Sequence, residues 1–167
     1  FTANSLNCLC EALGMALPTN GTLPMVYSQR LALAKKAGEA VMTLLKKNIR
    51  PLDIMTPAAF KNAETVDMAI GASTNTVLHL IAIAREAGLT KEQVSVDILN
   101  GISEKTPNLC RLAPAGEHYI EELNEAGGIS AVMNELYQAN LLDGEVMTVS
   151  AMPLKEVIKN AKICDEE

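Results

Sequence analysis

An almost uninterrupted apolar run inside a helical stretch constrains this chain more than any other feature of its sequence. Residues 77–84 read VLHLIAIA, between Ser73, which can cap a helix, and Gly88, which can end one. A helix that is apolar nearly all round is buried on most sides. We therefore expect residues 74–87 to lie within a larger packed body, because they could hardly form the outside of a small isolated bundle.

The remaining periodicity predicts a mainly α fold of packed helices with at most one or two short strands. Thr56 and Pro57 supply a capping hydroxyl and a first-turn proline for one helix. In the loop at 14–24, Asn20-Gly21 favours a turn with positive φ. Helices are expected at residues 2–13, 25–48, 57–70, 74–87, 91–105, 117–126, 129–142 and 153–161, and extended segments at 108–112 and 146–150.

The helix expected at 25–48 is amphipathic. One face would carry Leu31, Ala34, Gly38, Val41, Leu44 and Leu45. Basic residues gather on the remainder, at Lys35, Lys36, Lys46 and Lys47, with Arg50 just beyond. A solvated face explains this basic cluster better than a binding site does.

Composition excludes several classes of protein. The chain has 167 residues, a size typical of one domain, and its net charge of −6 comes without a basic stripe interleaved with aromatics. No apolar run reaches the roughly 18 residues that a membrane span needs. We expect a cytoplasmic protein that binds neither nucleic acid nor membrane, with free thiols at Cys8, Cys10, Cys110 and Cys164.

The residues that could carry chemistry form no recognisable catalytic or metal-binding set. Cys8 and Cys10 are two apart, so on a helix they point to nearly opposite sides. His79 lies in the apolar run, where a hydrogen-bonded core histidine is the simpler interpretation, and His118 is expected in solvent. The residue pattern alone thus predicts no catalytic residue and no metal ligand.

Three stretches, in order, resemble the dihydroxy-acid dehydratase and sugar-acid dehydratase family. They read FTANSLNCLCEALGMALPTNGTLP at the start, GASTNTVLHLIAIAREAG at 71–88 and KTPNLCRLAPAGEHYIEELNEAGG at 105–128. Thr76 followed by Val77 and Leu78 looks more like the branched-chain enzymes than the phosphogluconate dehydratases. The resemblance implies that residues 1–167 form a single helical subdomain from the larger α/β N-terminal domain of a longer enzyme.

Enzymes of this family remove water from a 2,3-dihydroxy acid to give a 2-keto acid, in valine and isoleucine biosynthesis for the branched-chain members. The resemblance implies an iron–sulfur cluster acting as a Lewis acid on the departing 3-hydroxyl, with Mg²⁺ at the carboxylate end. Their ligands and the catalytic base belong to family segments that this sequence does not contain. We therefore expect an inactive fragment that binds no cofactor, from a parent enzyme that takes a dihydroxy acid and dimerises.

Six polar residues could still border the cluster. Thr2, Asn4 and Ser5 follow the family's third cluster cysteine closely and could donate hydrogen bonds around the cluster. Ser73, Thr74 and Asn75 stand at a helix N-terminus, which suits contact with an anion or a cluster. Helix capping alone would explain the same residues equally well.

Two other functions are compatible with the sequence. The parent could be a sugar-acid dehydratase of phosphogluconate type, since substrate choice depends on a domain outside this sequence. Alternatively, the chain could be a helical interaction module that docks on another protein through residues 77–84.

Overall fold

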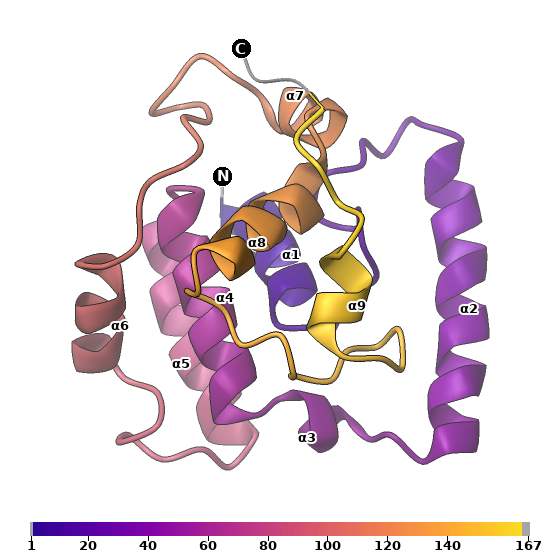
Figure 1. Ribbon diagram of the computed structural model, residues 1–167, viewed down its shortest axis with the longest axis horizontal. Helices are drawn as coiled ribbons and strands as arrows, with labels where there is room; N and C mark the ends of the chain where they lie inside the picture. The colour runs from indigo at the N-terminus through magenta and orange to yellow at the C-terminus, as the bar shows by residue number, and fades with distance from the viewer. Residues whose placement is uncertain (1, 165–167) are drawn as a thin grey trace.

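Helix α4 (Pro57–Ala69) forms the centre of the computed structural model, which describes residues 2–164 (Figure 1). The Thr56 hydroxyl accepts a hydrogen bond from the Ala59 amide, and Pro57 occupies the first turn, as the sequence predicts. Five hydrophobic side chains along α4 are completely buried: Ala59, Phe60, Ala63, Val66 and Ala69.

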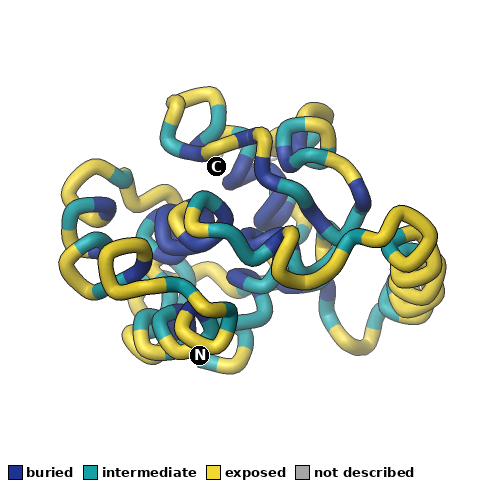
Figure 2. Tube along the Cα trace, turned by 90° about the horizontal axis from the view of Figure 1, so that it is seen from below, coloured by how far each residue is buried: buried dark blue, intermediate teal, exposed yellow. Residues whose placement is uncertain are grey.

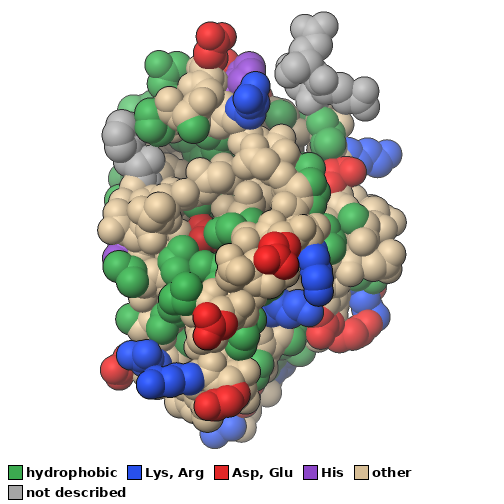
Figure 3. All heavy atoms as spheres, turned by 90° about the vertical axis from the view of Figure 1, so that its left-hand side faces the viewer, with side chains coloured by type: hydrophobic (Ala, Val, Ile, Leu, Met, Phe, Trp, Pro, Cys, Tyr) green, Lys and Arg blue, Asp and Glu red, His purple; other side chains and the backbone are tan. Residues whose placement is uncertain are grey.

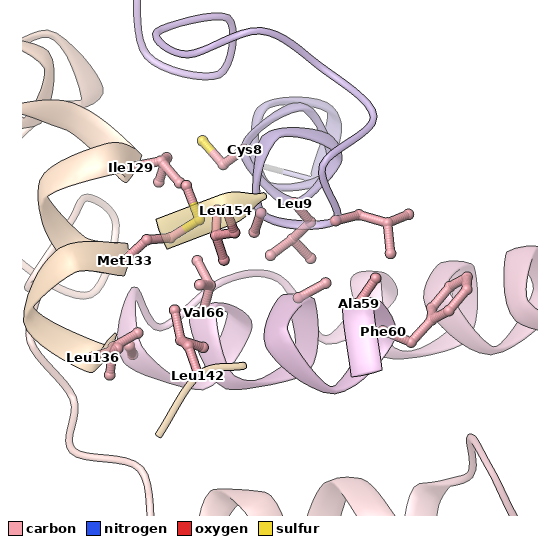
Figure 4. Close-up of a cluster of buried hydrophobic side chains, with 14 of the residues drawn as sticks. Cys8, Leu9, Ala59, Phe60, Val66, Ile129, Met133, Leu136, Leu142 and Leu154 are labelled. Carbon is pink, nitrogen blue, oxygen red and sulfur yellow. The ribbon is translucent and has the colours of Figure 1, made fainter. Parts of the chain in front are cut away.

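The other core helices pack around α4. Those in direct contact with it are α1 (Thr2–Ala12), α5 (Thr74–Glu86), α6 (Val96–Ser103) and α8 (Gly128–Gln138). Two short helices, α7 (Ile120–Glu125) and α9 (Leu154–Ile158), lie against α8. Figure 4 shows side chains of α1, α4, α8 and α9 meeting in one cluster, which includes Leu9, Val66, Met133 and Leu154. The chain thus encloses an aliphatic core of its own.

Residues 2–164 contain no β-sheet, so the mainly α expectation is confirmed. The two segments expected to be extended form only isolated bridges, Leu112 with His118 and Met147 with Pro153. Several helices are shorter than expected, since α6, α7 and α9 cover only parts of 91–105, 117–126 and 153–161. A short helix that the sequence did not predict, α3 (Pro51–Ile54), begins at Pro51. No helix within the described residues is long and apolar enough to cross a membrane.

The expectation that the apolar helix is buried on most sides is wrong for this chain. Only Thr76, Leu80 and Ala84 of α5 are buried, and they form a single stripe against α1 and α4. Leu78, on another side of the helix, is 65% exposed. The face of the molecule around α5 and α6 shows hydrophobic side chains interspersed with both signs of charge (Figure 3).

Helix α2 (Gln29–Lys47) stands apart from the rest of the fold (Figure 1). None of its residues is buried, and the burial view shows it almost wholly exposed (Figure 2). Lys35, Lys36 and Lys46 are in solvent as expected, whereas Lys47 donates a hydrogen bond to the Ala151 carbonyl (3.2 Å). Arg30, at the start of the helix, is half-buried and donates to the Asn20 carbonyl (3.1 Å). The expected apolar face is largely exposed, although Leu44 is half-buried.

Candidate functional site

The N-terminal ends of α1 and α5 meet at a polar junction. The Thr2 and Ser73 hydroxyl oxygens are 3.0 Å apart, although these residues are 71 positions apart in the sequence. The Asn75 amide group donates to the Thr2 hydroxyl (3.0 Å), and the Ser73 backbone N–H donates to the Ser5 hydroxyl (3.3 Å). Ser73 also caps α5 by accepting from the Asn75 backbone N–H (3.3 Å). Four of the six polar residues singled out in the sequence therefore form one hydrogen-bonded group.

The other two lie beside this group without joining it. The Asn4 side chain donates to the Gly21 carbonyl (3.1 Å) and to the Cys8 sulfur (3.4 Å), so it ties α1 to the 14–24 loop. Thr74 is exposed in the first turn of α5. Thr2, Asn4, Ser5, Ser73 and Thr74 all line an open cavity of about 540 Å³, which the 112–115 segment and Tyr119 close on the far side.

The side chains that line the cavity can form hydrogen bonds, but none of those described is charged. Hydroxyl, amide and apolar groups line it, and no Asp, Glu, Lys, Arg or His is among the described lining residues. Its one thiol, Cys8, is 1% exposed, and burial raises the pKa of Cys8 to about 12. The thiol is therefore protonated at neutral pH and is neither a nucleophile nor a ready metal ligand.

The donor set in this part of the chain does not fit direct binding of an iron–sulfur cluster or of Mg²⁺. Iron–sulfur clusters take thiolates, and Cys8 and Cys10 do not form a chelating pair, because Cys8 is buried beside the Gly21 carbonyl and Cys10 is half-buried. Across residues 2–164, no three His, Cys, Asp or Glu side chains come close enough to hold a metal ion. The neutral hydroxyl and amide groups do fit hydrogen bonding to a negatively charged group placed at the cavity.

Glu11 holds the 14–24 loop against α1 and was not singled out in the sequence. Its carboxylate is 2% exposed and accepts hydrogen bonds from the backbone N–H groups of Thr19 (3.1 Å) and Gly21 (3.2 Å). It also accepts one from the Ser130 hydroxyl of α8 (3.1 Å). Burial raises the pKa of Glu11, against the effect of these three donors. In the sequence, Glu11 lies among the apolar residues Leu9, Ala12 and Leu13. A carboxylate in such surroundings indicates a buried group that needs hydrogen-bond donors, and this signal could have identified Glu11.

Gly21 brings the 14–24 loop against α1 by close approach. A Cβ atom at this position would lie 2.6 Å from the Cys8 Cα, so no other residue fits without displacing backbone. The positive φ expected at Asn20-Gly21 occurs instead at Thr19 (72°). The glycine is thus required for space rather than for its backbone angle.

Two buried carboxyl groups lie on α4, and one of them, Asp67, holds the start of α5. Thr76, in the first turn of α5, hydrogen-bonds to Asp67 (2.7 Å) and contacts the Ser73 carbonyl. Burial, together with the nearby Asp67, raises the pKa of Glu64 to about 7, and burial raises the pKa of Asp67 to about 6 despite the opposing effect of Thr76. Both groups therefore change charge close to neutral pH.

Stability of the chain should consequently depend on Glu64 between pH 5 and pH 8. Its ordinary pKa is 4.5 and its folded pKa is about 7. The folded state thus holds the proton more tightly, and stability falls as pH rises through this window. Glu64→Gln should raise the free energy of unfolding at pH 8 by about 1–2 kcal/mol relative to the unsubstituted chain.

Urea denaturation at pH 5.5 and pH 8 measures this effect. The unsubstituted chain should lose more stability between the two pH values than Glu64→Gln does. Glu86→Gln, on the exposed side of α5, is the matched control and should keep the original dependence. An identical pH dependence in the unsubstituted chain and Glu64→Gln would contradict the assignment.

His79 does not have the partner that a core histidine was expected to find. The ring is half-buried, and its Nδ1 is buried without a hydrogen bond in the described structure. Asn75, four residues earlier, was a candidate partner but donates to Thr2 and Ser73. His118 is exposed as expected, with Nδ1 3.6 Å from a Glu122 carboxylate oxygen.

Comparison with known proteins places these features in a family. The sequence model described as "Dihydroxy-acid/6-phosphogluconate dehydratase N-terminal" matches residues 1–157. A dihydroxy-acid dehydratase of Acetivibrio thermocellus is 56% identical over 167 residues, which is 100% of this chain and 30% of that protein. One of Clostridium kluyveri is 61% identical over 159 residues, which is 95% of this chain and 28% of that protein.

The similarity extends along nearly the whole chain but over less than a third of each of these relatives. It includes α1, the 14–24 loop and the start of α5, so the residues of the polar junction all lie within the matched region. The chain belongs to the dihydroxy-acid/6-phosphogluconate dehydratase family and is a fragment of that family's N-terminal region.

Proposed function

We propose that this chain is a structural part of a hydro-lyase that converts 2,3-dihydroxy carboxylic acids to 2-keto acids in branched-chain amino-acid biosynthesis. The observation that carries the proposal is identity of 54–61% to proteins named dihydroxy-acid dehydratase. The longer protein would act in the cytoplasm as a homodimer and would contain an iron–sulfur cluster and Mg²⁺. The 167-residue chain alone would be inactive and free of both.

In the parent enzyme, we propose that the polar junction borders the cluster and does not ligate it. The cluster would supply the Lewis acid that assists departure of the 3-hydroxyl. Thr2, Ser5 and Ser73 would donate hydrogen bonds toward cluster sulfurs or their cysteine ligands, since their hydroxyl groups line a cavity without charged side chains. Asn75 would orient the Thr2 and Ser73 hydroxyl groups, to which its amide donates. Such donors influence a cluster's reduction potential and its resistance to oxygen.

The experiment uses the full-length enzyme that contains this sequence. Purified with its cluster, the enzyme should dehydrate 2,3-dihydroxyisovalerate faster than 6-phosphogluconate. The reverse preference would establish the phosphogluconate-type alternative. Absence of iron together with absence of turnover on both substrates, in folded full-length protein, would contradict the proposed function.

The role of the junction has its own test. Ser73→Ala should leave the iron content unchanged but shift the reduction potential of the cluster and alter its rate of bleaching in air. Ser103→Ala is the control, because Ser103 is exposed at the end of α6 and hydrogen-bonds only to the Asn100 carbonyl (2.7 Å). Equal reduction potentials and equal bleaching rates in the two variants would show that Ser73 does not border the cluster.

A further inference from the structure

The chain contains two Asn-Gly pairs, Asn20-Gly21 and Asn100-Gly101. Asparagine deamidates readily before glycine, because glycine has no side chain to keep its backbone nitrogen away from the preceding carboxamide. The glycine nitrogen loses its proton and bonds to the asparagine Cγ, and the carboxamide nitrogen leaves with that proton as ammonia. Water then opens the resulting succinimide to aspartate or isoaspartate. Since water is the only other reactant, the surrounding fold decides how fast each pair reacts.

The first pair is built into the packing of the 14–24 loop against α1. A Cβ on Gly21 would lie 2.6 Å from the Cys8 Cα, so glycine is required there for space. Asn20 joins the loop to α1, because its amide group donates to Asn7 Oδ1 (2.6 Å) and its backbone carbonyl accepts from the Asn7 amide group (3.0 Å). A less reactive residue at either position would therefore weaken this contact.

A buried carboxylate holds the nitrogen that would attack. The Gly21 backbone N–H donates to Glu11 Oε2 (3.2 Å), and Glu11 is 2% exposed. The reaction requires loss of this proton, and the anionic nitrogen that forms would face a group of the same charge in surroundings from which water is largely excluded. The hydrogen bond to Glu11 therefore opposes the first step.

Two other side chains hold the carboxamide that would be attacked. Besides donating to Asn7, the Asn20 side chain accepts at Oδ1 from the Arg30 guanidinium group (3.3 Å). Arg30 also donates to the Asn20 backbone carbonyl (3.1 Å). Ring closure must bring the Asn20 Cγ within bonding distance of the Gly21 nitrogen. The carboxamide has to leave both of its partners to do so.

We propose that Asn20-Gly21 is a latent deamidation site, which Glu11 and Asn7 keep unreacted while the 14–24 loop packs against α1. Local opening of the loop releases the Gly21 N–H and the Asn20 carboxamide together, so the site reacts from the open form. The product carries a carboxylate in place of the amide group that donates to Asn7, and isoaspartate also adds a methylene group to the backbone. A deamidated loop therefore no longer fits α1.

Asn100-Gly101 provides an internal reference for the chemistry. Asn100 is exposed in the second half of α6, and its carbonyl accepts from the Ser103 hydroxyl (2.7 Å). A Cβ on Gly101 would meet no atom within 4 Å. Because α6 packs against α4, the rate at this pair should follow the state of α6 and be independent of the Glu11 hydrogen bonds.

The 167-residue chain can be tested directly because it encloses its own core. It is incubated at pH 8 and 37 °C, and mass spectrometry of its proteolytic peptides measures deamidation at each pair. Asn20 should react more slowly in the folded chain than in guanidinium chloride, by about tenfold or more. Equal rates at Asn20 in the folded and unfolded chains would overturn the proposal.

Two variants separate local opening of the loop from loss of global stability. Glu11→Ala should raise the rate at Asn20 by about tenfold or more and leave the rate at Asn100 unchanged. Phe60→Ala is the control, because it removes a fully buried ring from α4 and keeps the Glu11 hydrogen bonds. It should raise the rate at Asn20 by less than Glu11→Ala does, even where it destabilises the chain more. An equal or larger increase in Phe60→Ala would overturn the proposal.

A third variant decides the matter if Glu11→Ala does not fold. Asn7→Ala keeps Glu11 and frees the Asn20 carboxamide, so the rate at Asn20 should rise severalfold while the far-ultraviolet circular dichroism stays the same. An unchanged rate at Asn20 in this variant would overturn the proposal. These measurements need neither iron nor substrate, so their outcome is independent of the proposed dehydratase function.

Discussion

Phe60→Ala should lower the free energy of unfolding of the 167-residue chain by about 3–5 kcal/mol, the largest effect expected of any single core truncation here. Phe60 is the largest of the fully buried side chains, and it lies on α4, the helix around which the others pack. Truncation to alanine loses the transfer free energy of the ring and leaves a cavity that the surrounding helices fill only in part.

Urea denaturation followed by far-ultraviolet circular dichroism measures this loss as a shift in the transition midpoint. Leu78→Ala is the control, because Leu78 is an apolar side chain that is 65% exposed. It should cost less than about 1 kcal/mol, as surface substitutions commonly do. Similar losses for the two variants would mean that α4 is not the centre of the core.

Glu11→Ala should destabilise the chain by about 2–4 kcal/mol, because it leaves three hydrogen-bond donors without their acceptor, two of them on the buried residues Gly21 and Ser130. Two of them are the backbone N–H groups of Thr19 and Gly21, which cannot turn toward water without moving the loop. The third is the Ser130 hydroxyl on α8. Loss of the carboxylate should therefore loosen the 14–24 loop in addition to lowering overall stability.

Hydrogen exchange distinguishes this local effect from general destabilisation. The Thr19 and Gly21 amides should exchange much faster in Glu11→Ala, while amides in the middle of α4 should follow only the change in global stability. Glu39→Ala, on the exposed side of α2, is the matched control and should change neither. Continued protection of both loop amides in Glu11→Ala would show that the carboxylate does not hold the loop.

Features that depend on neighbouring residues could be predicted from the amino-acid order alone. Thr56 with Pro57 and Ser73 marked helix starts correctly, because a capping hydroxyl reaches an amide only two or three positions away. The repeat of apolar positions likewise predicted a mainly α chain. The sequence also indicated the family, because three stretches resemble it in the same order. The family model matches residues 1–157.

Which faces are covered and which polar groups meet depends on how helices distant in the sequence pack together. Thr2 and Ser73 lie within hydrogen-bonding distance because α1 and α5 pack together, and no pattern within either helix contains that contact. The role of Glu11 likewise depends on a loop and a helix far away in sequence. Periodicity shows that a helix has an apolar side, but burial depends on what packs there, so α5 is only partly covered and α2 is left exposed.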